Sequence, residues 1–170
     1  MSLLVGLYKA LGKWWKEHFL SAEIAISIVG ASFFWLWIHS HDGHKIIYGF
    51  LSGRRGSLYG TLAGIHGTLL GFSLATTAIV LGLVTRDSQG FELLRNSEAY
   101  PMLWKTFMSS VRILGIAAVT TLLALFVDGE SPHTNHWALV AVVGTTLAAG
   151  LRTARVIWAL GHIVVISTGE

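Results

Sequence analysis

Histidine is the residue in this sequence whose placement most clearly suggests chemistry. Three histidines with the spacing H-x-H-x-x-H follow one apolar stretch, and two with the spacing H-x-x-H precede another; they are His39, His41, His44, His133 and His136. Imidazoles this close together can share one divalent ion, and neutral histidine suits zinc, nickel and copper. Imidazole also changes its charge between about pH 5 and 8, as a pH sensor requires. The third interpretation is that these are ordinary solvated histidines beside lipid headgroups.

His66 has a different setting, because it lies inside an apolar segment between Gly64 and Gly67. An ionisable residue inside a membrane span normally faces protein or water and is a functional candidate. His66 is therefore a candidate to line a pore, to relay protons or to form a hydrogen bond in a packed interface. The glycines would also admit a flat cofactor such as a haem, whose second ligand would be His39, His136 or the His66 of another copy.

Enzyme catalysis finds no support in the sequence. It contains no nucleophile elbow, phosphate-binding loop or H-E-x-x-H motif. It also contains no cysteine, which excludes disulfides and thiolate metal sites. We expect Asp and Glu to lie only in loops and at the ends of spans, which argues against a proton pump or a cation-coupled carrier. The expected protein is not an enzyme, does not bind nucleic acid, and has no cofactor unless histidines hold a haem or a divalent metal.

The elements that position these side chains are transmembrane helices. Hydrophobic residues make up 53% of the 170 residues and charged residues only 12%, against roughly 25% charged residues in a soluble domain. Four stretches are long enough to cross a hydrocarbon core, which takes roughly 20 helical residues. We expect spans at about 21–40, 57–85, 107–127 and 136–166. The predicted fold is all-α: an integral membrane four-helix transmembrane bundle in residues 21–170, preceded by an N-terminal amphipathic interfacial helix in residues 1–20.

The second span carries a continuous face of small residues. They recur in steps of three and four, and they are Gly60, Gly64, Gly67, Gly71, Ala75, Ala78 and Gly82. The pattern repeats every eleven residues, a period that favours a right-handed crossing. Small residues let helix backbones approach closely within lipid. We therefore expect this face to be a helix-packing surface, within the chain or on another copy, and we expect this span to lie at the centre of the molecule.

A polar line follows a second side of the same span. It consists of Tyr59, His66, Ser73 and Thr77. Helical geometry places this line about 135° away from the small-residue face. The four residues are therefore candidates to line a pore if second spans surround a symmetry axis.

Three arginines on the third and fourth spans complete the set of pore-lining candidates: Arg112, Arg152 and Arg155. At the mouth of a pore they would favour anions over cations. Arg152 and Arg155 have two other interpretations, an anionic headgroup site and ordinary ion pairs. The acidic partners expected for such pairs are Asp87, Glu92 or Glu98.

Charge and tryptophan placement predict the topology. With both termini in the cytoplasm, the inner regions of the predicted topology, including the inner ends of the spans, hold nine of the twelve Lys and Arg residues, and the outer regions hold three. This agrees with the positive-inside rule, and the seven tryptophans fall at the two expected boundaries. We expect a multi-pass membrane protein with both termini on the cytoplasmic side.

These features lead to three functional hypotheses. The first is a small homo-oligomeric channel or pore that favours anions and responds to pH. The second is a non-catalytic integral accessory subunit that stabilises a larger membrane complex. The third is a haem-binding or metal-binding redox protein of the membrane. In each case the expected partners are the lipid bilayer and either a second copy or another membrane protein.

Overall fold

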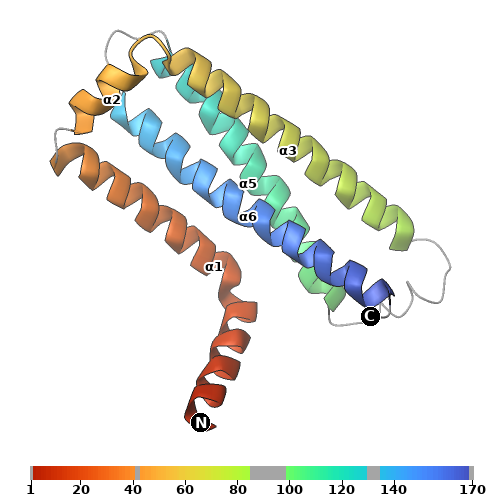
Figure 1. Cartoon of the computed structure of the whole chain (residues 1–170). Helices are drawn as coiled ribbons and strands as arrows, with labels where there is room; N and C mark the ends of the chain where they lie inside the picture. Colours follow the sequence, from red (N-terminus) through yellow and green to blue (C-terminus); the bar gives the residue numbers. More distant parts are fainter. Residues whose placement is uncertain (1, 41–42, 85–98, 130–134, 169–170) are drawn as a thin grey trace.

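The described residues form a bundle built mainly of long helices (Figure 1). The structure, a computed structural model, describes residues 2–40, 43–84, 99–129 and 135–168. The helices in these ranges are α1 (Ser2–Ser40), α2 (Gly43–Leu51), α3 (Arg55–Val84), α5 (Ala99–Asp128) and α6 (His136–Thr168). These ranges contain no strand, and the predicted all-α bundle is confirmed.

Four of the described helices are long and apolar enough to cross a membrane. Their qualifying segments are Ser21–Ser40, Arg55–Ile79, Trp104–Asp128 and His136–Trp158. At most of their ends, these segments agree with the four predicted spans to within a few residues. The four segments identify a multi-pass membrane protein. α1 continues without interruption through residue 20 and changes direction between its N-terminal part and its span (Figure 1). The side chains of residues 1–18, which carry the predicted amphipathic pattern, lie outside the part of the structure that is described.

Local sequence explains where the helices begin. Gly53 has a φ of 69°, a left-handed conformation that suits glycine and turns the chain from α2 into α3. Pro101 is tolerated in α5 because it lies in the first turn, where its missing N–H is not needed. Asn135 caps α6, since its Oδ1 accepts a hydrogen bond from the Ala138 N–H at 3.4 Å.

The helices pack in the order α3, α5, α6, α1, so α5 and α6 are the two central helices. α2 packs against α1 at one end of the bundle, which we call the α2 end (Figure 1). There a hydrophobic cluster joins all five helices through residues that include Ile38, Ile47, Tyr59, Ala124 and Val142. A second cluster, built on Leu114, Ala117 and Ala149, holds α3, α5 and α6 together farther along the bundle.

The expected central position of the second span is wrong for the single chain. α3 lies at the edge of the bundle, and its main packing partner is α5 (Figure 1). The polar line of α3 faces this neighbour, and the small-residue face does not. The physical reason is that lipid supplies no hydrogen-bond partners, so polar side chains gain more from an inward position than glycines do.

Small residues elsewhere do bring two helices of the chain together. A Cβ added to Gly144 of α6 would lie 3.2 Å from the Cβ of Ala31 in α1, and one added to Gly30 would lie 3.0 Å from Leu147 Cδ1. These short distances show that α1 and α6 approach closely at Gly30 and Gly144. In lipid, small residues at such positions let two helix backbones approach closely and pack against each other.

Candidate functional site

The small-residue face of α3 is bare. All seven of its residues are exposed. A Cβ added to any of its five glycines, which are Gly60, Gly64, Gly67, Gly71 and Gly82, would meet no atom within 4 Å. From Gly60 to Ala78 this face therefore has no packing partner in the described chain, and its predicted role in helix packing is a prediction about another molecule.

The polar line of α3 is buried against α5. Tyr59, His66 and Thr77 are 0%, 2% and 5% exposed, and Ser73 is partly buried. His66 Nδ1 lies 3.2 Å from the hydroxyl of Thr121 on α5. Thr77 donates a hydrogen bond to the Ser73 carbonyl one turn earlier at 2.7 Å. In the single chain these four side chains therefore lie within protein, and water could reach them only if α3 and α5 separated.

A carboxylate joins three helices at the α2 end. Asp128, the last residue of α5, is fully buried. Its Oδ1 accepts a hydrogen bond from Arg55 Nη1 at 2.8 Å and another from the Asn135 N–H at 2.7 Å. Its Oδ2 accepts one from the Tyr59 hydroxyl at 2.7 Å. Asp128 thus ties the start of α3 and the start of α6 to the end of α5; we call these four residues the Asp128 junction.

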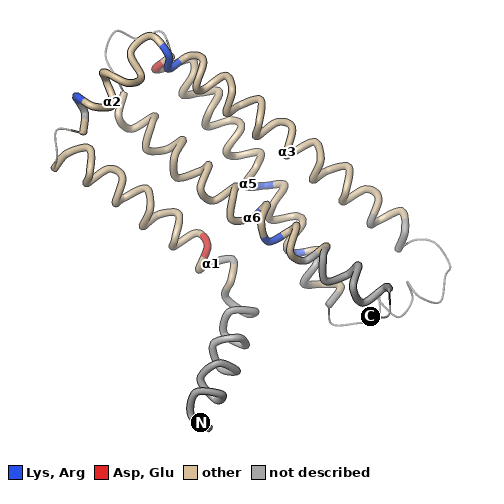
Figure 2. Tube along the Cα trace, in the orientation of Figure 1, with Lys and Arg blue, Asp and Glu red and all other residues tan. Residues whose placement is uncertain are grey.

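A second charged cluster lies toward the opposite end of the bundle. Glu23 of α1 forms an ion pair with Arg152 of α6, with 2.9 Å between Oε2 and Nη1. Arg155 Nε donates to the other carboxylate oxygen of Glu23, and the Arg155 guanidinium lies 4.0 Å above the ring of Phe19. Figure 2 shows the acidic position on α1 across from the basic positions on α6. We call Glu23, Arg152 and Arg155 the Glu23 cluster.

The Glu23 cluster adds a partner that was not predicted. Glu23 is the third residue of the first span, so it lies at a span end as expected for an acidic residue, but it is only 4% exposed. It pairs with Arg152 and Arg155, and the predicted partners Asp87, Glu92 and Glu98 lie outside the described residues. A signal was present in the sequence: Glu23 lies near one end of its span at the same expected depth as the two arginines.

Comparison with protein-family models, curated proteins and solved structures finds no match for this chain. The arguments for its function therefore come from its own residues and contacts. Those contacts give the Asp128 junction and the Glu23 cluster a clear structural role, since a buried charge in lipid is costly unless it is paired.

Arg112 differs from Arg152 and Arg155 because it is exposed, although it lies within the span of α5. It is on the side of α5 opposite the buried residues Ser110, Leu114 and Ala117. A long basic side chain in this position reaches toward the headgroups or toward water. Arg112 is thus separate from the Glu23 cluster, and the three predicted arginines do not form one group.

The predicted metal or pH-sensing histidines do not form a described cluster. His39 is exposed and its ring centroid lies 4.4 Å from that of Trp35, while His136 is partly buried at the start of α6. His41 and His133 lie outside the described residues, as does the side chain of His44. Within the described ranges no three His, Cys, Asp or Glu side chains are placed to hold a metal ion.

Proposed function

We propose that the chain is a non-catalytic integral subunit of a larger membrane assembly, which it joins by packing the small-residue face of α3 on another transmembrane helix. One observation carries this proposal: a Cβ added to any of four glycines on one face of an edge helix, Gly60, Gly64, Gly67 and Gly71, would meet no atom within 4 Å. In lipid the benefit of such a face is close contact with another backbone, where dispersion and packing replace the hydrophobic effect.

The remaining polar groups favour the same proposal. Tyr59 is paired with Asp128, His66 with Thr121, and Arg152 with Glu23. These contacts hold the helices of the bundle together, and a rigid bundle is a suitable support for a docking face. The period of eleven residues favours a right-handed crossing with the partner helix, whether that helix is a second α3 or belongs to another protein.

Replacing Gly71 with leucine tests this proposal. The added side chain separates the two backbones, and overpacking of this kind costs about 1–3 kcal/mol, so the association constant is expected to fall at least about fivefold. Sedimentation of the purified protein in mild detergent measures self-association, and copurification from the native membrane measures association with another protein.

Gly150→Leu is the matched control. Gly150 is an exposed glycine of α6, and a Cβ added to it also meets nothing within 4 Å. Both substitutions remove a helical glycine and add the same apolar side chain, so they differ only in the helix face that they alter. Equal association of wild type, Gly71→Leu and Gly150→Leu would refute the docking role of α3.

A homo-oligomeric channel that favours anions is the second candidate, and the exposed position of Arg112 within the α5 span favours it. Intramembrane basic residues commonly face a water-filled path. If Arg112 lines such a path, Arg112→Gln is expected to reduce chloride flux into liposomes about tenfold, because the arginine raises the local anion concentration. Lys105→Gln is the control, since Lys105 is an exposed basic residue nearer the end of the same helix. Absence of ion flux for the wild type at every pH and voltage would exclude the channel.

A further inference from the structure

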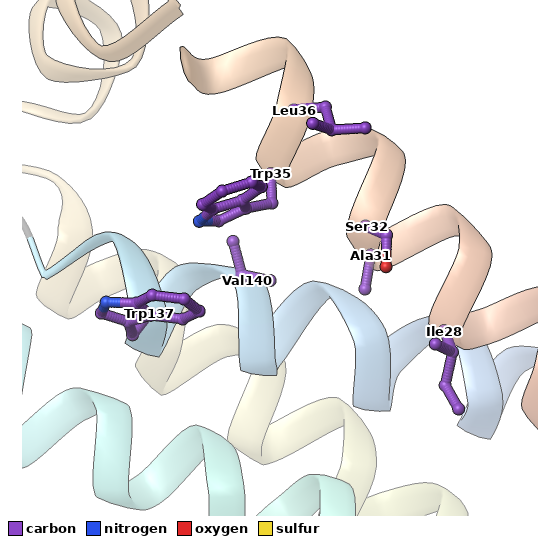
Figure 3. Close-up of a pocket in the computed structure, with 7 residues that line it drawn as sticks. All are labelled: Ile28, Ala31, Ser32, Trp35, Leu36, Trp137 and Val140. Atoms are coloured by element: carbon purple, nitrogen blue, oxygen red, sulfur yellow. The ribbon is translucent and has the colours of Figure 1, made fainter.

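A groove lies between α1 and α6 on the surface of the bundle (Figure 3). Its volume is about 490 Å³, within the roughly 300–1,000 Å³ of ligand sites in proteins. Residues of α1 such as Ile28 and Ser32 form one wall, and Trp137 and Val140 of α6 form the other. The groove has the size of a ligand site and lies apart from the bare face of α3.

The walls of the groove match a hydrocarbon occupant. All of its lining residues belong to the membrane-crossing segments Ser21–Ser40 and His136–Trp158. The lining is almost entirely apolar, and the side-chain polar atoms that it contains are the Ser32 hydroxyl and two indole nitrogens. A groove at this depth is open to acyl chains, and water or a polar ligand would find few partners in it.

The two tryptophans give the groove a polar end. The rings of Trp35 and Trp137 are stacked, with centroids 6.0 Å apart. Figure 3 shows both indole nitrogens on the side away from Ile28, which is the side toward the α2 end because α1 runs from Ile28 to Ser40. Tryptophan commonly takes this orientation at a membrane interface, with its ring in the apolar region and its N–H toward the headgroups.

An apolar groove with two donors at one end suits an amphiphile with a hydrocarbon tail and an acceptor-rich head. We infer that the groove binds one acyl chain of a phospholipid from the leaflet at the α2 end. The chain lies between α1 and α6, and the indole N–H groups of Trp35 and Trp137 donate to ester or phosphate oxygens of the headgroup. This inference is independent of the proposed docking role of α3.

Native mass spectrometry tests the inference on protein taken from nanodiscs of phosphatidylcholine of a single defined mass. The wild type is expected to retain one lipid per chain under mild activation. Ser32→Phe fills the groove from its rim and is expected to lower the retained fraction about tenfold, the change for a loss of roughly two buried methylenes. Leu36→Trp fills the same groove from another position and serves if Ser32→Phe does not fold. Val29→Phe is the matched control, because Val29 is an exposed α1 residue that does not line the groove.

The outcomes separate a bound lipid from other occupants. Loss of the lipid in a folded groove-filling variant, with retention in Val29→Phe, supports the site. Equal retention in all variants would mean that the lipid is bound elsewhere, and no retained lipid in the wild type would mean that the groove holds only bulk lipid. A groove-filling variant that dissociates an oligomer would show that a second copy covers the groove. Each of these last three results overturns the inference.

Discussion

Glu23→Ala is expected to destabilise the bundle by about 3–5 kcal/mol, the usual cost of removing one member of a buried ion pair. The substitution removes the carboxylate that pairs with Arg152 at 2.9 Å and with Arg155. The Arg152 side chain is only 2% exposed, so it has little access to water in which to recover its solvation. Unfolding by SDS in mixed micelles, followed by circular dichroism, measures the difference in free energy.

A double substitution distinguishes the effect of losing the ion pair from the effect of losing the Glu23 side chain alone. Glu23→Leu combined with Arg152→Leu removes both charges of the Glu23–Arg152 pair and fills the space with apolar atoms. We expect it to recover part of the stability lost in Glu23→Ala, because replacing a buried ion pair with apolar residues is often neutral or favourable. A Glu23→Ala protein as stable as the wild type would show that the Glu23 cluster does not hold α1 to α6.

The four spans were predictable because their signal is local. A stretch such as residues 107–127 is apolar over its whole length, and its crossing of a bilayer follows from hydrophobicity and the rise per residue alone. The start of α5 near Pro101 is likewise a local feature, since proline is accepted in a first helical turn. Predictions of this kind do not depend on which helices are neighbours.

The neighbours of each helix face were harder to predict. The glycines of α3 and the line from Tyr59 to Thr77 both pointed to helix contacts, and the sequence did not say which contact forms within the chain. The structure turns the polar line toward α5, where Asp128 and Thr121 provide partners. The decisive information is the identity of groups at matching depth on another helix, which a pattern along one helix does not contain.

The Glu23 cluster shows the same limit. An isolated glutamate near the end of an apolar stretch is easily assigned to the boundary, where water would solvate it. Only the arrangement of α1 beside α6 shows that Arg152 and Arg155 surround it. The close approach at Gly30 and Gly144 was also not predicted, because these single glycines form no long periodic face.

Asp128→Ala is expected to have the largest effect at the other end of the bundle, with a loss of about 3–5 kcal/mol. It leaves the buried Arg55 guanidinium without its carboxylate, and it also removes the acceptor for the Tyr59 hydroxyl and the Asn135 N–H. Tyr59→Phe removes a single hydrogen bond to a charged group and is expected to cost less, about 1.5–3 kcal/mol. The same unfolding measurement ranks these variants by their loss of stability.

Adjacent arginines provide the control for this prediction. Arg55 is 6% exposed and pairs with Asp128, whereas Arg54 is exposed. Arg55→Ala should approach the cost of Asp128→Ala, while Arg54→Ala should change stability by no more than about 0.5 kcal/mol. A double-mutant cycle on Arg55 and Asp128 then isolates their coupling. Equal costs for the two arginine variants would mean that the junction contributes little to stability.

The Asp128 junction also bears on assembly, because it fixes the rotation of α3 about its own axis. Two of the groups that Asp128 holds, Arg55 and Tyr59, belong to the first turns of α3. While they face α5, the glycine face is held outward. If that face docks another helix, Asp128→Ala should weaken association without touching the docking surface, whereas Gly71→Leu should weaken association with little loss of bundle stability. Measuring association and bundle stability for both variants distinguishes a damaged docking surface from an intact docking surface that faces the wrong direction.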